Sequence, residues 1–311
     1  MAADPFLKWA GGKRQLLPEI RRYYPDDVGT YFEPFLGSGA VFFDLLRHGL
    51  LEGRRAVLSD TNADVVGCYR VVRDRPGAVI AHLRRLADGH ARRSTAHYYD
   101  VRDGRFNPAR ARLGGLGSPS VIVEAYTPAL AAMLIYLNRT GFNGLFRLNS
   151  RGKFNVPAGR YANPSICDDT NLRLVAAALT RHAVLSANSF ESVLEHAVPG
   201  DFVYFDPPYA PLSPTARFTA YTADGFGDEE HVRLQQVVVA LAKRGCAVVL
   251  SNSIAPLVRS LYDRNTEARA AGLKAHLVRA RRAINCLPSA RSGVFEYLIT
   301  NVPARRPARR R

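Results

Sequence analysis

The chain has 311 residues, of which 47% are hydrophobic and 23% charged, and its formal net charge is +16. This length accommodates one large domain or two smaller ones, and no apolar run reaches the length of a membrane span. The strongly basic balance indicates an anionic partner, for which nucleic acid is the usual candidate.

The two ends of the chain and its cysteines add further expectations. The start has no basic region followed by an apolar stretch, so we expect no secretory signal, no membrane association and a cytoplasmic location. Residues 304–311 hold five arginines and one proline and predict a disordered basic tail. The four cysteines lack the spacing of a metal or redox site, so no metal is expected.

The first part of the chain alternates helices and strands. A glycine-containing loop at residues 9–13 comes first, and a glycine turn at Gly37–Gly39 lies between a strand and a helix. The expected elements are a helix from about Leu16, a strand at Tyr31–Glu33, a helix from Ala40 to about Leu46, and a strand at Ala56–Leu58 that ends at Ser59 and Asp60.

The middle region, residues 63–167, has a different composition. It begins as a helical pattern, and residues 125–137 predict a second helix. Residues 107–120 contain proline, glycine and arginine with little periodicity and predict a mobile loop. Residues 139–161 are dense in glycine, asparagine, arginine and aromatic residues, which favours a binding surface over a core.

The last part of the chain returns to alternating elements. A polar loop is expected at residues 210–227. The expected elements are a helix from near Leu172, strands at Ala183–Leu185 and Phe202–Phe205, a helix from about Asp228, and a strand at Ala247–Leu250. This alternation predicts an α/β fold with a mostly parallel sheet.

The tetrapeptide Asp206-Pro207-Pro208-Tyr209 follows one of these apolar strands. Two prolines cannot continue a strand ladder, so a carboxylate and an aromatic ring are left at a rigid strand end. Ligands of doubly wound sheets bind outside such ends. A hydrogen-bond acceptor beside a flat ring suits a planar substrate with an exocyclic amine, although an ordinary exit from a strand has the same pattern.

A second candidate site combines Gly37 and Gly39 with Asp60. Glycines at a strand-to-helix turn allow close approach of a ligand, and an acidic residue about twenty positions later suits ribose hydroxyls. The third glycine of a dinucleotide fingerprint is absent, since position 42 is Phe42. A nucleoside that carries no phosphate, such as S-adenosylmethionine, therefore fits better than the dinucleotide NAD. Trp9, the single tryptophan, lies in a glycine-containing loop that suits either closure over a ligand or packing.

Four motifs in one order now give a specific resemblance. They are Lys8-Trp9-Ala10-Gly11-Gly12-Lys13, residues 33–39, Ser59-Asp60-Thr61-Asn62, and the tetrapeptide at residues 206–209. The series resembles the Dam-type DNA adenine-N6 methyltransferases of the D12 class, and residues 136–161 resemble their target-recognition segment. The resemblance covers roughly residues 6–301 and is weakest at 107–120 and 255–269.

This resemblance implies a Rossmann-like methyltransferase sheet with an inserted, mainly helical target-recognition domain. Residues 1–62 and 168–303 would form the catalytic, cofactor-binding domain, and residues 63–167 the DNA-binding domain. The cofactor would be S-adenosylmethionine, converted to S-adenosylhomocysteine. Its expected contacts are Trp9, Lys13, Glu33, Phe35, Gly37, Gly39, Asp60, Ser189 and Phe190.

The resemblance also assigns roles in catalysis and DNA reading. Asp206, Pro207, Pro208 and Tyr209 would hold the amine of a flipped adenine, with the Asp206 carboxylate and the Pro207 carbonyl as acceptors and the Tyr209 ring as a stacking surface. Arg147 and Lys8 would each read a guanine, and Phe142 would wedge into the duplex. Leu145 and Pro157 would make apolar contacts to thymine. The expected DNA-binding residues are Lys8, Arg139, Phe142, Asn143, Leu145, Arg147, Arg151, Pro157, Arg160 and Tyr161.

The implied activity is that of a site-specific, adenine-specific DNA methyltransferase acting on double-stranded DNA as a monomer, with GATC as the target. Three alternatives remain open. The same chemistry at another motif would suit a restriction-modification system. RNA or protein methyltransferases usually have asparagine in place of Asp206 and lack the segment at residues 139–161. A DNA-binding protein without catalysis is disfavoured by the intact Asp206 and Tyr209.

Overall fold

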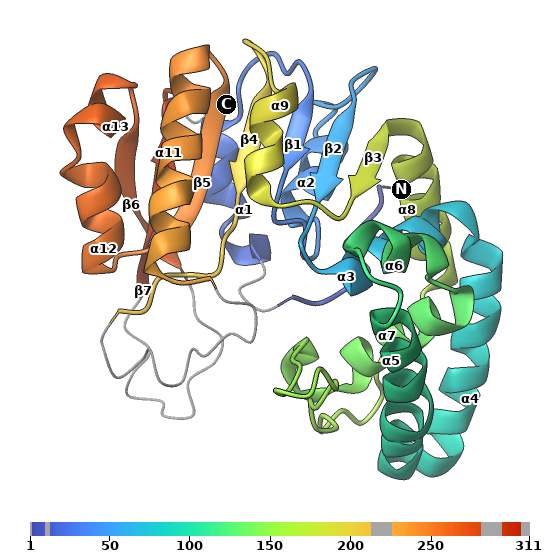
Figure 1. Ribbon diagram of the computed structural model, residues 1–311. Coiled ribbons are helices and arrows are strands. Elements are labelled where there is room, and N and C mark those ends of the chain that lie inside the picture. The colour runs from blue at the N-terminus through green and yellow to red at the C-terminus, as the bar shows by residue number, and fades with distance from the viewer. Residues whose placement is uncertain (1, 10–12, 213–225, 281–293, 306–311) are drawn as a thin grey trace. The chain divides into compact units, whose positions relative to one another are not determined.

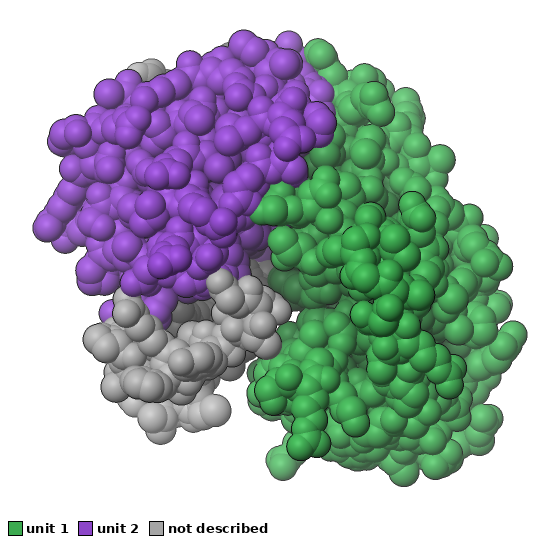
Figure 2. All heavy atoms as spheres, in the orientation of Figure 1, with its two compact units in different colours: residues 1–12, 36–189 green, residues 13–35, 190–311 purple. Residues whose placement is uncertain are grey.

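The computed structural model describes residues 2–9, 13–212, 226–280 and 294–305 (Figure 1). The chain divides into two compact units, coloured separately in Figure 2. Unit 1 comprises residues 1–12 and 36–189, and unit 2 comprises residues 13–35 and 190–311. This division follows compactness and differs from the predicted split into catalytic and recognition domains, which stays a prediction.

A seven-stranded sheet has the order β3-β2-β1-β4-β5-β7-β6. The pairs β2–β3, β1–β4 and β4–β5 are parallel, whereas β7 is antiparallel to both β5 and β6. The predicted α/β fold with a mostly parallel sheet is therefore confirmed. The strands are β1 (Tyr31–Glu33), β2 (Ala56–Ser59), β3 (Ala183–Ser186), β4 (Phe202–Phe205), β5 (Ala247–Ser253), β6 (Lys274–Ala280) and β7 (Val294–Thr300).

Unit 1 is mainly helical outside its two strands, and α4 packs along α7 while α3 contacts α6, α7 and α8 (Figure 1). Its helices are α2 (Ala40–Arg47), α3 (Ala63–Asp74), α4 (Pro76–Tyr99), η3 (Asp100–Phe106), α5 (Asn107–Gly114), α6 (Pro119–Ala125), α7 (Pro128–Thr140), η4 (Phe142–Gly144) and α8 (Asp169–His182). Side chains of Asn62, Thr127 and Asp168 cap α3, α7 and α8 by accepting a backbone N–H.

The prediction of a mobile loop at residues 107–120 is wrong, because α5 and the start of α6 occupy that stretch. Its helicity depends on distant partners. The buried Asn107 amide donates to the carbonyl of Phe154 at 3.0 Å and accepts from its N–H at 2.8 Å. Arg110 pairs with the buried carboxylate of Asp64 at 2.5 Å. A weakly periodic sequence is thus held helical by tertiary contacts.

Unit 2 holds the other helices of the described residues, each of five residues or fewer apart from α11. They are η1 (Lys13–Gln15), α1 (Leu17–Ile20), η2 (Arg21–Tyr23), η5 (Phe190–Ser192), α9 (Val193–His196), α11 (Asp228–Arg244), α12 (Pro256–Val258), η6 (Arg259–Asp263) and α13 (Thr266–Ala270). Most of the polar loop predicted at 210–227 lies outside the described residues. Within the tail predicted at 304–311, Arg305 pairs with Asp26 at 2.8 Å, and residues 306–311 lie outside the described part.

Among the described residues, no single helix is long and apolar enough to cross a membrane, although the bent pair α6 and α7 passes a test of length and composition.

Candidate active site

The tetrapeptide follows β4, whose four residues are all buried, and belongs to unit 2. Oδ1 of Asp206 lies 2.7 Å from Nζ of Lys13 and accepts a hydrogen bond from the Ser251 hydroxyl at 3.1 Å. Burial raises the pKa of Asp206 above its ordinary value, while Lys13 and the hydrogen bond from Ser251 oppose that rise. Lys13, which was expected near the cofactor, is thus brought to the predicted catalytic carboxylate.

The ring of Tyr209 is fixed at its polar end. Its hydroxyl donates to the Glu296 carboxylate on β7 at 2.7 Å, and the Lys13 ammonium lies 4.6 Å from the ring centroid. Burial, followed by the charges of Asp206 and Glu296, raises the pKa of Tyr209 well above its ordinary value. Tyr209 therefore stays protonated and keeps donating, which sets the orientation of its ring.

The end of β5 supports the residue after the tetrapeptide. The Asn252 side chain accepts from the Ala210 N–H at 3.1 Å, and the Ser253 hydroxyl donates to the Ala210 carbonyl at 2.6 Å. Sequence reasoning assigned no role to this strand end or to Glu296. The signal available for the end of β5 was its polar run at residues 251–253, directly after the apolar residues 247–250. No local signal pointed to Glu296.

The glycine turn belongs to unit 1 and has the geometry that its sequence predicts. Gly37 and Gly39 have φ values of +45° and +63°, in the left-handed region that favours glycine. The Gly37 N–H donates to Oδ2 of Asp60 at 3.0 Å, and Oδ1 of Asp60 accepts from the Asn62 N–H at 2.9 Å. A Cβ at position 37 would lie 2.7 Å from Cδ1 of Trp9. The turn, the carboxylate and the indole therefore form one tight group.

This group fits S-adenosylmethionine by its chemistry. A carboxylate at the end of β2 suits ribose hydroxyls, and the side chain missing at Gly37 leaves room for the indole beside the turn. In unit 2, Phe35 stacks on Phe190 with centroids 5.6 Å apart, and Phe226, which sequence reasoning missed, contacts both rings. Apolar rings of this kind suit the flat face of an adenine.

The other predicted cofactor residues have contacts of their own. Glu33 is buried in unit 2 and accepts a hydrogen bond from the Tyr31 hydroxyl at 2.9 Å. Ser189 is the last residue of unit 1. Among the described residues, no group of three or more histidine, cysteine, aspartate or glutamate side chains is arranged to hold a metal ion.

All the predicted DNA-binding residues lie in unit 1, and most follow α7 in a hairpin-like segment. The Asn155 N–H donates to the Arg147 carbonyl at 3.1 Å, and Leu148 and Phe154 form an antiparallel bridge. Nε of Arg147 donates to the Asn155 side chain at 2.8 Å. One edge of the guanidinium is therefore held by Asn155, and the Arg147 side chain is otherwise exposed.

Other members of this set differ in exposure and contacts. Phe142 and Tyr161 are large aromatic residues that are 49% and 39% exposed, as expected of residues that contact a partner. Arg139 instead donates from Nε to the Phe6 carbonyl at 3.0 Å, so it holds the N-terminal segment. Exposed residues of the set are Asn143, Arg151, Pro157 and Arg160, and Leu145 is half-buried.

Comparison with known proteins identifies the family. A model of the D12 class of N6 adenine-specific DNA methyltransferases matches residues 9–284. The chain belongs to this class. Its methyl donor is S-adenosylmethionine and its substrate is DNA, as the resemblance implied.

Curated relatives align over almost the whole chain. Type II methyltransferase M1.LlaDCHI of Lactococcus lactis subsp. cremoris is 38% identical, covering 96% of this chain and 95% of its own length. Type II methyltransferase M.MjaIII of Methanocaldococcus jannaschii is 38% identical over 97% of this chain and 100% of its own length. The DNA adenine methylase of Escherichia coli K12 is 33% identical over 96% and 95%.

Among solved structures, the delta-N METTL16 MTase domain is 11% identical and covers 93% of this chain and 82% of its own, with a TM-score of 0.32. So low a score does not bear on function.

Proposed function

We propose that this D12-class methyltransferase is a site-specific enzyme (EC 2.1.1.72) that methylates adenine N6 in GATC. The observation that carries the target assignment is the hairpin around Arg147, whose guanidinium is held at Nε by Asn155. A guanidinium fixed on one edge presents its two Nη groups to guanine O6 and N7, and such a pair contributes about 1–3 kcal/mol of discrimination.

In the proposed reaction, Asp206 and Tyr209 receive the flipped adenine. Flipping costs a few kcal/mol, and stacking on the Tyr209 ring offsets about 1–3 kcal/mol of that. The Asp206 carboxylate and the Pro207 carbonyl accept the two N6 hydrogens, which turns the nitrogen lone pair toward the methyl donor. Positioning supplies most of the acceleration, and Ser251 and Glu296 fix the two side chains that do it.

We assign cofactor contacts to two groups of residues. In unit 1, Asp60 accepts from the ribose hydroxyls, with Trp9, Gly37, Gly39 and Ser189 beside it. In unit 2, Phe35 and Phe190 contact the adenine, and Glu33 and Lys13 complete the set. Bound S-adenosylmethionine supplies an electrophilic methyl group.

The remaining assignments of the proposal concern organisation. Residues 63–167 act as the recognition domain, and residues 1–62 and 168–303 as the catalytic domain. The protein works as a monomer in the cytoplasm. Sedimentation of the purified protein with and without a GATC duplex tests the monomer, because a mass of two chains per duplex contradicts it.

The decisive experiment incubates the purified protein with S-adenosylmethionine and unmethylated plasmid and maps N6-methyladenine at single-base resolution. Methylation confined to GATC supports the whole proposal. Methylation of another motif keeps the chemistry and removes the assigned readout by Arg147 and Lys8. Absence of methylated adenine, with cofactor binding retained, contradicts the proposed catalytic site.

A second candidate keeps the chemistry but changes its setting. The two relatives at 38% identity are named Type II methyltransferases, which favours a partner of a restriction endonuclease with its own motif. The same plasmid map distinguishes the motif. Protection of the methylated plasmid from an endonuclease that cuts that motif tests the restriction role.

A further inference from the structure

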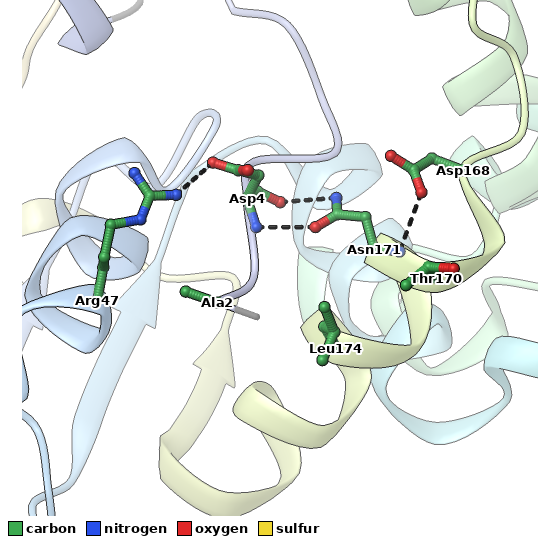
Figure 3. A pocket seen from close by; sticks show the side chains of 7 residues that line it. All are labelled: Ala2, Asp4, Arg47, Asp168, Thr170, Asn171 and Leu174. Atoms are coloured by element: carbon green, nitrogen blue, oxygen red, sulfur yellow. Dashed lines mark hydrogen bonds and ion pairs between the residues drawn. The ribbon is translucent and has the colours of Figure 1, made fainter.

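The N-terminal segment of unit 1 is held by asparagine side chains. The Asn171 amide on α8 accepts from the Asp4 N–H at 2.8 Å and donates to the Asp4 carbonyl at 2.9 Å (Figure 3). The carboxylate of Asp4 also pairs with Arg47 at 2.6 Å. The Asn171 amide thus binds both the N–H and the C=O of Asp4, as a residue of an adjacent antiparallel strand would do.

Asn138 on α7 repeats this pairing four residues farther along the segment. Its Oδ1 accepts from the Lys8 N–H at 2.7 Å, and its Nδ2 donates to the Lys8 carbonyl at 2.8 Å. The same Nδ2 donates to the Gly144 carbonyl at 2.8 Å. Both amide hydrogens are therefore used, and the side chain is only 2% exposed. A single buried amide thus joins Lys8 to the recognition segment.

The side chain of Lys8 is also confined. Gly144 has a φ of +63°, and a Cβ there would lie 2.5 Å from the Cβ of Lys8, so the stem packs directly on this glycine. The ammonium lies 4.6 Å from the ring centroid of Tyr161. A long, flexible side chain is in this way restricted before DNA arrives, which reduces the conformational entropy lost on binding.

We propose that Asn138 is a positioning residue for sequence readout, which fixes the backbone of Lys8 so that its ammonium meets one base pair of the target. The inference rests on the proposed role of Lys8 in reading DNA. Asn138 does not touch the base itself. It acts through Lys8, and its loss is expected to weaken discrimination at the base pair that Lys8 reads.

A double-mutant cycle tests this. The full-length enzyme and its Lys8→Ala, Asn138→Ala and double variants are compared by kcat/KM on duplexes carrying the target or each single base-pair change. Lys8→Ala should lower discrimination at one base pair by about 5- to 150-fold. Asn138→Ala should lower it at the same base pair by at least about fivefold, and should have no further effect when Lys8 is already alanine.

Two further variants make the test specific. Asn171→Ala removes the same kind of amide pairing from the same segment, but at Asp4, and should leave discrimination unchanged. Gly144→Ala keeps Asn138 intact and pushes on the Lys8 stem, so it should reproduce the loss even if Asn138→Ala folds poorly. Thermal melting shows which variants are folded.

The outcomes separate the inference from the proposed function. If Lys8→Ala leaves every preference intact, the proposed readout by Lys8 is wrong, and the inference is overturned with it. If Lys8→Ala relaxes one base pair while folded Asn138→Ala and Gly144→Ala do not, the inference alone is overturned. An equal loss from Asn138→Ala in both backgrounds also overturns it, because the amide then acts through another residue.

Discussion

Replacing Gly37 by alanine tests the cofactor site through a contact that the structure measures. An alanine in the left-handed region costs about 1–2 kcal/mol. In addition, its Cβ would lie 2.7, 3.0 and 3.1 Å from three atoms of the Trp9 ring, so the indole must move by about 0.7 Å to reach ordinary contact. Gly49 is the matched control, because its φ is +73° and a Cβ there meets no atom within 4 Å.

Both variants carry backbone strain, but only Gly37→Ala displaces Trp9. If Trp9 borders the cofactor, we expect Gly37→Ala to bind the cofactor more weakly by about 1.4–2.8 kcal/mol, or 10- to 100-fold. Trp9 is the single tryptophan of the chain, so its fluorescence during titration with S-adenosylhomocysteine reports this site directly. Gly49→Ala should keep the emission and affinity of the parent. Equal affinities for the two variants would refute the placement of Trp9 at the cofactor.

Four other predictions concern catalysis, readout and stability. Asp206→Asn should lower the single-turnover methylation rate by about 100-fold or more while DNA binding persists, and a rate near that of the parent contradicts its role. Because burial raises the pKa of Asp206 and Lys13 opposes this, the rate should fall as pH drops through that raised pKa, and Lys13→Met should move the fall to higher pH; superimposable profiles contradict this. Arg147→Ala should lose about 1–3 kcal/mol of discrimination at one guanine in competition between duplexes, and an unchanged preference removes Arg147 from the readout. Burial also lowers the pKa of His97 below its ordinary value of 6.5. Below pH 6.5 the unfolded chain therefore binds a proton at this residue more readily than the folded chain, and the melting temperature should fall as pH drops through 6.5. His97→Leu should flatten that fall, and an unchanged slope contradicts the assignment.

Local sequence patterns predicted much of the sheet. β4 is an apolar run and β1 has two aromatic residues before Glu33, and both are bounded by turn residues. The structure has strands at the predicted residues Tyr31–Glu33 and Phe202–Phe205. The helix predicted from Ala40 is α2, which begins directly after the left-handed Gly39. In each case the signal lies within a few residues of the element, so no tertiary information is needed.

Features that depend on distant partners escaped prediction. Glu296 reaches Tyr209 across 87 positions of sequence, and Ser251 reaches Asp206 across 45. Neither contact can be inferred before the strand order is known, and β7 lies between β5 and β6 against the order of the chain. The helix α5 also escaped prediction because it depends on a distant partner. Its composition does not favour a helix, and hydrogen bonds between Asn107 and Phe154 stabilise it.

The proposed catalytic side chains also explain why Lys13 lies where it does. Its ammonium is 2.7 Å from Asp206 and 4.6 Å from the centre of the Tyr209 ring, which are the two groups that an adenine amine and its ring would contact. Before substrate arrives, this charge opposes the rise in the pKa of Asp206 that burial causes. An amine that is being methylated gains positive charge, which the carboxylates of Asp206 and Glu296 stabilise and the ammonium opposes. The flipped base is therefore expected to take over the hydrogen bond of Lys13 at Asp206 while the new bond forms.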